Sequence, residues 1–124
     1  MSLKSILIVD DSPIIVERLA LMLENLDNIT EIGRAADYLS AISLLAESVP
    51  TVVLLDINLP GRNGISLLQF IKYTYPAVIV IMITNQAGDN YRKICNQMGA
   101  DYFIDKSKDF EQIPSIISSL RPSF

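Results

Sequence analysis

The chain has 124 residues, half of them hydrophobic and 19% charged, which predicts one globular domain (residues 1–124) with no second, output domain. Its net charge of −4, without a block of Lys or Arg, argues against a nucleic-acid surface, and the absence of histidine excludes histidine-based catalysis, histidine metal ligands and a self-supplied phosphohistidine. Cys95 is the single cysteine, and no run resembles a signal peptide or membrane span, so we expect a cytoplasmic protein without disulfides.

The first half of the chain alternates predicted strands with helices that each have one buried face. A short apolar run over residues 6–9 predicts a strand, and Ser12 as N-cap with Pro13 at the first helical position predicts a helix. The weaker, partly polar run over residues 30–35 suits a strand at a sheet edge. Asp37 is expected to cap a second helix, which ends before Pro50. The residues expected to face the core are Ile15, Leu19, Met22, Leu23 and Leu26 in the first helix and Leu39, Ile42, Leu45, Ala46 and Val49 in the second.

The second half continues this alternation around more strongly apolar runs. Residues 52–55 predict a fully buried strand that ends at Asp56, and residues 78–83 predict a central strand that ends at Thr84. A fifth strand is expected over residues 102–104, ending at Asp105 and Lys106. The helix after the third strand opens at Asn63-Gly64 and closes at Tyr75-Pro76, and the helix after the fourth follows a loop at 85–88 and ends at Gly99. The core residues expected in the last three helices are Ile65, Leu68 and Ile71, then Tyr91, Ile94, Cys95 and Met98, then Phe110, Ile113, Ile117 and Leu120.

Five strand–helix units in strict alternation predict an α/β fold, with a parallel sheet covered by helices on both faces. We expect five helices and the doubly wound, flavodoxin-like strand order 2-1-3-4-5, in which strands one and three are neighbours. The carboxyl ends of these strands then bring Asp10, Asp11 and Asp56 together, with Thr84 and Lys106 on the neighbouring strands.

The chemistry of these side chains favours a metal-dependent reaction at phosphorus. Three carboxylates at one point repel one another, and a hard divalent cation such as Mg²⁺ relieves that repulsion. With the charge neutralised, Asp56 can act as a carboxylate nucleophile and form an aspartyl phosphate. Thr84 and Lys106 suit the other phosphoryl oxygens, through a hydrogen bond and a positive charge.

Four segments of the chain resemble the receiver domain of two-component response regulators, as in single-domain chemotaxis regulators. The resemblance covers essentially the whole chain, in the right order and spacing. The segments are Ile-Leu-Ile-Val-Asp10-Asp11-Ser-Pro, Leu-Leu-Asp56-Ile-Asn-Leu-Pro-Gly, Ile-Thr84-Asn and Gly-Ala-Asp-Tyr-Phe103-Ile-Asp-Lys106.

The resemblance implies a role for each matching residue. Asp56 resembles the phosphoacceptor, Asp11 a direct Mg²⁺ ligand and Asp10 a ligand acting mainly through water. The backbone carbonyl of Asn58 is expected to complete the metal shell. Two further implications concern switching: Thr84 and Lys106 grip the phosphoryl group, and Phe103 is the aromatic switch residue.

Three residues depart from the family pattern. Ser107 stands where the family usually has proline, commonly after a cis bond; a cis bond before serine costs about 2.5–4 kcal/mol, so the sequence leaves the Lys106–Ser107 conformation open. Asn85 is larger than the residue often found there and is expected to narrow access to the phosphoryl site. Because Phe103 has no hydroxyl, switching is expected to depend on burial of its ring.

The implied function is a phosphorylation-controlled signalling module rather than an enzyme with a separate substrate. A histidine kinase or histidine phosphotransfer protein would supply the phosphoryl group. The surface of the fourth helix, fifth strand and fifth helix would then control a downstream effector protein, without contact to nucleic acid or membrane. A receiver excised from a longer DNA-binding regulator is a version of the same function. Tyr91 and Tyr102 are candidates for this recognition surface or for packing, whereas Cys95 is expected to be a packing residue.

Three other classes compete with this hypothesis. A Mg²⁺-dependent phosphatase of the haloacid dehalogenase type also forms an aspartyl phosphate, but it needs a second carboxylate where this chain has Asn58. A flavodoxin-like flavin mononucleotide binder needs a neutral, hydroxyl-rich loop, and Asp10-Asp11 would repel the phosphate. A degenerate receiver used only for binding is disfavoured by the complete set of acidic, hydroxyl and lysine residues.

Overall fold

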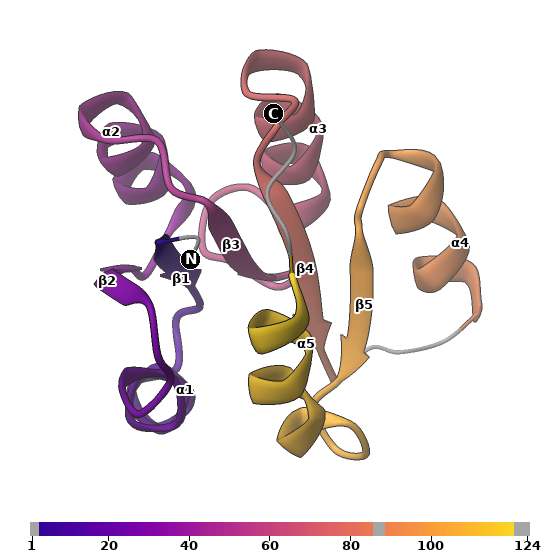
Figure 1. The fold of residues 1–124 in the computed structure, drawn as a ribbon. Helices are drawn as coiled ribbons and strands as arrows, with labels where there is room; N and C mark the ends of the chain where they lie inside the picture. Colours follow the sequence, from indigo (N-terminus) through magenta and orange to yellow (C-terminus); the bar gives the residue numbers. More distant parts are fainter. Residues whose placement is uncertain (1–2, 86–88, 121–124) are drawn as a thin grey trace.

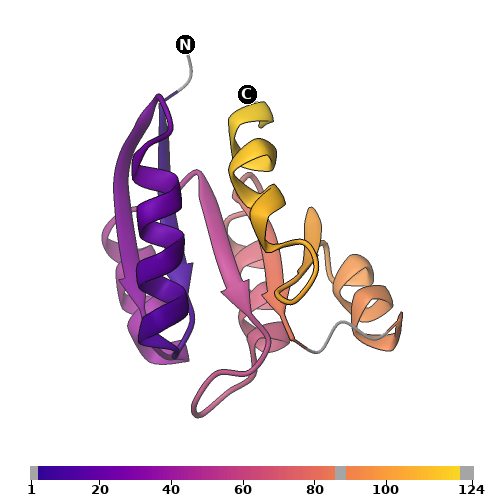
Figure 2. The ribbon, with the colours of Figure 1, turned by 90° about the horizontal axis from the view of Figure 1, so that it is seen from below.

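A computed structural model describes residues 3–85 and 89–120, in which five helices flank a five-stranded parallel sheet (Figure 1, and Figure 2 from below). The strand order is β2-β1-β3-β4-β5, which confirms the predicted doubly wound order and the edge position of β2. The strands are β1 (Lys4–Val9), β2 (Ile29–Ala35), β3 (Val52–Asp56), β4 (Ile79–Thr84) and β5 (Tyr102–Asp105). The helices are α1 (Pro13–Glu24), α2 (Tyr38–Glu47), α3 (Gly64–Thr74), α4 (Asp89–Gln97) and α5 (Ile113–Ser119), the last preceded by a 3-10 turn, Phe110–Gln112.

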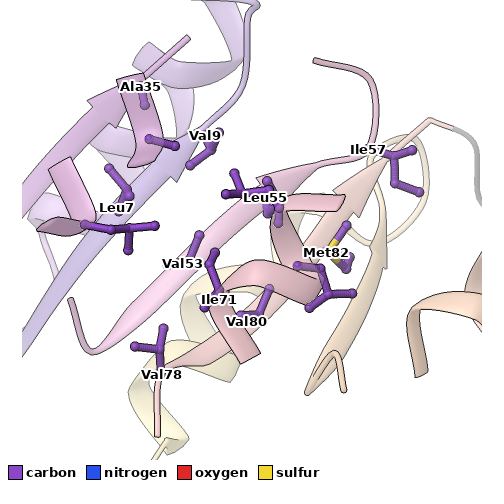
Figure 3. Packing of buried hydrophobic residues seen from close by; sticks show 14 of the residues in the cluster. Leu7, Val9, Ala35, Val53, Leu55, Ile57, Ile71, Val78, Val80 and Met82 are labelled. Carbon is purple, nitrogen blue, oxygen red and sulfur yellow. The ribbon is translucent and has the colours of Figure 1, made fainter. Parts of the chain in front are cut away.

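Two apolar layers hold the helices against the sheet. Successive side chains of β1 alternate between them, because neighbouring residues of a strand point to opposite faces. Ile6 and Ile8 pack with α1 and α5 on one face, while Leu7 and Val9 pack with α2, α3 and Cys95 of α4 on the other. Figure 3 shows part of the second layer, where side chains of β1, β3 and β4 meet those of α3. A fully buried Leu or Ile side chain contributes about 1.5–3 kcal/mol, so these layers fix the sheet and, with it, the strand ends.

Side-chain caps fix the first turns of α1, α2 and α3 close to the carboxyl edge of the sheet. Ser12, Asp37 and Asn63 accept hydrogen bonds from the backbone N–H groups of Ile15, Ser40 and Ser66, at 3.4, 2.7 and 3.0 Å. The predicted N-cap roles of Ser12 and Asp37 are confirmed. Gly99 lies beyond α4 with a φ of +99°, a left-handed conformation that favours glycine, as predicted for the end of this helix.

The inward face of α2 differs from the prediction. Ala41 and Leu45 are buried, but Leu39 is 75% exposed, and Ala46 is exposed as well. Val49, 51% exposed, lies beyond Glu47, where the helix ends, so helical spacing no longer governs where it points. Because Ala41 is buried in the core and Leu39 is exposed, the side of the helix that carries Ala41 faces the sheet.

Helix α4 also buries less than predicted. Cys95 is fully buried, as expected for a packing residue, but Tyr91 and Ile94 are exposed. Tyr102 on β5 is exposed as well, so both tyrosines considered for a recognition surface lie on the outside of the molecule. The predicted loop at 85–88 falls outside the described residues except for Asn85, which is exposed. Within the described ranges, no helix is both long and apolar enough to cross a bilayer.

Candidate functional site

The carboxylates predicted to converge do so at the carboxyl edge of the sheet. Asp10 follows β1 and Asp56 ends β3, and these two strands pair with Val9 opposite Leu55. One carboxylate oxygen from each of Asp10, Asp11 and Asp56 lies within 4.8 Å of the others. Asp10 and Asp56 are buried, with 3% and 6% exposure, whereas Asp11 faces solvent. Two carboxylates of the cluster are therefore buried in the protein, and the third is accessible to water.

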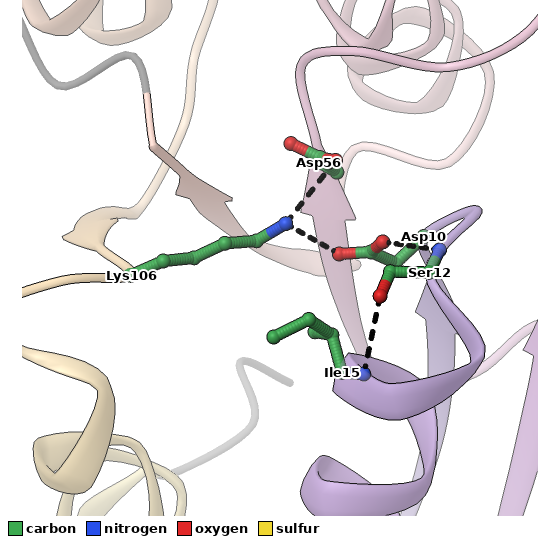
Figure 4. Close-up of polar contacts among 5 residues, drawn as sticks. All are labelled: Asp10, Ser12, Ile15, Asp56 and Lys106. Atoms are coloured by element: carbon green, nitrogen blue, oxygen red, sulfur yellow. Dashed lines mark hydrogen bonds and ion pairs between the residues drawn. The ribbon is translucent and has the colours of Figure 1, made fainter.

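Lys106 joins the two buried carboxylates, as Figure 4 shows. Its Nζ lies 2.7 Å from Oδ2 of Asp10 and 3.2 Å from Oδ2 of Asp56. The lysine follows β5, and β4 lies between β5 and β3, so its long stem spans the end of β4. The other oxygen of Asp10 accepts a hydrogen bond of 2.9 Å from the Ser12 N–H, so this carboxylate also holds the start of α1.

The pKa values of Asp56 and Lys106 reflect this crowding. Burial raises the pKa of Asp56, and the negative charge of Asp10 raises it further, against the opposing effects of Lys106 and a hydrogen bond from the Asn58 backbone. For Lys106, burial alone would lower the pKa. The hydrogen bond and charge of Asp10, together with the charge of Asp56, outweigh burial and raise it. The lysine therefore stays charged, whereas burial disfavours the ionised form of Asp56.

The two predicted switch residues lie on neighbouring strands. Thr84 is fully buried at the end of β4, and its backbone carbonyl accepts a 3.0 Å hydrogen bond from the Lys106 N–H. Phe103, on β5, is buried with its ring beneath the Arg92 guanidinium, whose carbon lies 4.7 Å from the ring centroid. Arg92 also donates a 3.4 Å hydrogen bond to the Phe103 carbonyl. Arg92 was not predicted as part of the site, because nothing in the sequence of α4 indicates which of its cations covers the strand.

Gly64 is a second residue that the sequence did not reveal as part of the site. A Cβ at this position would collide with the backbone carbonyl of Asp56. The Gly64 N–H also donates a 2.6 Å hydrogen bond to the Ile57 carbonyl, which brings α3 against the strand end. Its only signal was the Asn-Gly pair, which predicted a helix start but not a close approach to Asp56.

The structure shows the conformation of the Lys106–Ser107 peptide bond, which the sequence alone did not determine. No cis peptide bond occurs in the described part of the chain, so Lys106–Ser107 is trans. Asp105 accepts hydrogen bonds from both the N–H and the hydroxyl of Ser107, at 2.8 and 2.6 Å. These bonds lower the pKa of Asp105.

The donor set fits a small divalent cation. Mg²⁺ prefers oxygen ligands and retains several waters, and the cluster offers carboxylate oxygens from two strand ends with Asp11 open to solvent. Asn58 follows in the exposed loop after β3. A cation here would offset the effects of burial and of the Asp10 charge, which together raise the pKa of Asp56.

The sequence of this chain is similar to a known protein family and to regions of characterised proteins. Residues 6–118 match the family described as the response regulator receiver domain. The chain is 32% identical over 117 residues to the transcriptional regulatory protein MalR of Bacillus subtilis, covering 94% of this chain and 50% of MalR. It is 35% identical over 109 residues to a protein-glutamate methylesterase/protein-glutamine glutaminase of Clostridium acetobutylicum, covering 86% of this chain and 32% of that protein. The chain thus spans half or less of the length of these two curated relatives.

Solved structures show the same fold. The signal receiver domain of a DNA-binding response regulator from Colwellia psychrerythraea superposes with a TM-score of 0.84 at 31% identity. That similarity covers 92% of this chain and 94% of the other.

Proposed function

Because this chain belongs to the receiver-domain family of response regulators, a family of signalling phosphoacceptors, we propose that Asp56 is the residue that accepts the phosphoryl group. The observation that carries this proposal is the convergence of three carboxylates, two of which pair with the Lys106 ammonium. Asp56 ends a buried strand at the centre of this cluster, with Lys106 beside its carboxylate. The phosphoryl donor and the downstream effector of this domain are proposed in the paragraphs below from the same site.

Asp10, Asp11, Asp56 and the backbone carbonyl of Asn58 are proposed to hold Mg²⁺. When bound, this ion would supply positive charge against the carboxylates and the incoming phosphoryl oxygens. Asp11 is the residue most accessible to a hydrated ion, because it alone of the three aspartates is exposed. Asp10 already bonds to Ser12 and Lys106, which suits a contribution through water.

In the proposed reaction, a carboxylate oxygen of Asp56 attacks phosphorus. As the new O–P bond forms, the P–N bond of a donor phosphohistidine breaks and its electron pair returns to the imidazole, which takes up a proton. These 124 residues contain no histidine, so the donor histidine would lie outside them. Lys106 would balance charge on the phosphoryl oxygens, and the Thr84 hydroxyl would donate a hydrogen bond to one of them.

The output would follow from a shift in the positions of Thr84 and Phe103. Movement of Thr84 toward the phosphoryl group would leave space for the Phe103 ring and favour a different surface on α4, β5 and α5. Tyr91 and Tyr102 are exposed on this surface and are candidates for contact with a downstream effector protein. MalR is a transcriptional regulatory protein and the Clostridium relative a methylesterase, so one type of receiver serves different outputs. A cytoplasmic location, expected from the single cysteine, belongs to the same proposal.

The test is intact-mass spectrometry after incubation with Mg²⁺ and acetyl phosphate, a small-molecule phosphoryl donor. We expect a single phosphoryl adduct that is lost in Asp56→Asn and when the metal is chelated. Asp27→Asn, a change of an exposed aspartate in the turn before β2, is the matched control and should retain the adduct. An adduct that persists in Asp56→Asn, or no adduct in the wild type together with no response to Mg²⁺, would contradict the proposal.

A further inference from the structure

The backbone around Lys106 is held in a compact turn. The Lys106 N–H donates to the Thr84 carbonyl at 3.0 Å, which continues the pairing of β4 with β5. On the other side, the Asp105 carbonyl accepts hydrogen bonds from the N–H groups of Lys108 and Asp109, at 3.2 and 2.8 Å. Backbone hydrogen bonds therefore hold the chain on both sides of the Cα atom from which the Lys106 side chain extends.

The side chain of Asp105 closes the same turn. Its Oδ1 accepts the N–H of Ser107 at 2.8 Å and the hydroxyl of Ser107 at 2.6 Å. An aspartate that accepts the N–H two residues further on fixes the backbone of the intervening residue, which here is Lys106. Hydrogen bonds from Ser107 keep the pKa of Asp105 below its usual value, so the acceptor is ionised at neutral pH.

The position of this backbone determines whether the Lys106 ammonium can reach both buried carboxylates. Its four-carbon stem is flexible, and its ammonium must reach two carboxylates at once, 2.7 Å from Asp10 and 3.2 Å from Asp56. The Lys106 side chain is only 8% exposed, so it has little room to compensate for a displaced backbone. Charged groups that are already in position need no reorganisation during the reaction. Small errors in their placement therefore lower the reaction rate strongly.

We propose that Asp105 is a positioning residue for phosphoryl transfer, which acts by holding the Lys106–Ser107 turn through its two hydrogen bonds to Ser107. The inference rests on the proposed function of Asp56 and Lys106. It also gives a role to Ser107, whose N–H and hydroxyl are the donors that this turn requires. Asp105 touches neither the metal ligands nor the phosphoryl group in this scheme; it acts through the turn.

The experiment compares the phosphorylation rates of variants of the 124-residue chain with acetyl phosphate and Mg²⁺. Asp105→Ala removes the acceptor and should slow the reaction about fivefold, less than the hundredfold that a misplacement of about 1 Å can cost. Asp105→Asn keeps an acceptor oxygen without the charge and should restore a rate close to that of the wild type. The rates are compared at saturating Mg²⁺, because Lys106 pairs with two of the proposed metal ligands and its displacement would also change the metal affinity.

Two further measurements separate positioning from general damage. In a Lys106→Ala background, Asp105→Ala should have no additional effect, since the residue it positions is gone. Hydrogen exchange at the Lys106 ammonium, followed by NMR, should accelerate in Asp105→Ala even without a phosphoryl donor. Equal rates for Asp105→Ala and the wild type, equal loss in Asp105→Asn, additive losses in the double variant, or unchanged ammonium exchange would each overturn the inference. Absence of any adduct in the wild type, with accelerated ammonium exchange in Asp105→Ala, would reject the proposed function while leaving the positioning of Lys106 supported.

Discussion

The ammonium of Lys106 lies closer to Asp10 than to Asp56, at 2.7 against 3.2 Å. Asp10 is therefore the nearer partner of this lysine, and its charge adds to burial in raising the pKa of Asp56. We expect Asp10→Asn to lower the pKa of Asp56, because the repelling charge is removed while Lys106 remains. A carbon-detected NMR titration of the Asp56 carboxyl measures this. An unchanged or higher pKa in the variant would show that the charge of Asp10 does not raise the pKa of Asp56.

Asp56→Asn should raise the free energy of unfolding at neutral pH in the absence of metal. The pKa of Asp56 is raised in the folded protein, with the favourable effect of Lys106 already included, so folding favours the protonated side chain. The stability that Asp56 contributes is thus fully present below its ordinary pKa of 3.8 and is lost as the pH rises through the folded value. Urea unfolding at neutral pH and near pH 3.5 measures the difference, which should shrink toward the acid end. A variant less stable than the wild type at neutral pH would contradict the argument.

Mg²⁺ should stabilise the wild type against unfolding, and less so the Asp11→Asn variant. A ligand at a hundredfold excess over its Kd adds about 2.7 kcal/mol to the stability of a folded protein. Because Asp11 is the exposed carboxylate of the cluster, its loss should weaken binding and reduce this gain. Thermal unfolding across a Mg²⁺ titration, with Asp27→Asn as the control, provides the measurement. Equal responses of Asp11→Asn and the wild type would exclude Asp11 as a ligand.

Gly64→Ala should cost about 2 kcal/mol or more, because the added Cβ collides with the Asp56 carbonyl, a backbone atom that cannot turn aside. Gly61→Ala is the matched comparison. Gly61 has a φ of +87° but open space around its Cβ position, so its loss should cost only about 1 kcal/mol of backbone strain. Chemical denaturation of the two variants compares the effects. A smaller loss at Gly64 than at Gly61 would mean that α3 can move away from the strand end.

Arg92→Leu should release the ring of Phe103 at a small cost in stability. A cation over an aromatic face at an exposed site contributes about 0.5–1 kcal/mol. Arg62 lies in the same way over Tyr38, 5.0 Å from the ring centroid, so Arg62→Leu is a control that should cost as much without affecting Phe103. Fluorine NMR of fluorophenylalanine-labelled protein would report the environment of the Phe103 ring. A Phe103 signal unchanged by Arg92→Leu would show that packing alone keeps the ring buried.

The features of this molecule that could be predicted from the sequence are the strand order and the residues at the carboxyl ends of the strands. A buried run that stops at a polar residue marks the edge of the sheet, so the meeting of Asp10, Asp11, Asp56 and Lys106 follows from strand order alone. The rotation of α2 could not be predicted, because apolar residues occur all around it and only contact with the sheet buries Ala41 instead of Leu39.

Close contacts between a helix and a strand could not be predicted for a related reason. The approach of Gly64 to Asp56 depends on distances between backbones, and a sequence pattern specifies which residues are apolar but not how closely two backbones pack. The position of Arg92 over Phe103 likewise depends on where α4 lies beside β5. The roles of the site residues in phosphorylation stay predictions.

The ion pairs of Lys106 also determine the charge balance of the pocket. Three aspartates and one lysine leave two negative charges when all are ionised. A dication restores neutrality, whereas a monovalent ion leaves an excess of negative charge and a trivalent ion overshoots. In the proposed metal site, Lys106 would thus help to select the valence of the bound ion without contributing a ligand. Replacing Lys106 with a neutral side chain would make the pocket a better receptor for trivalent ions, such as lanthanides.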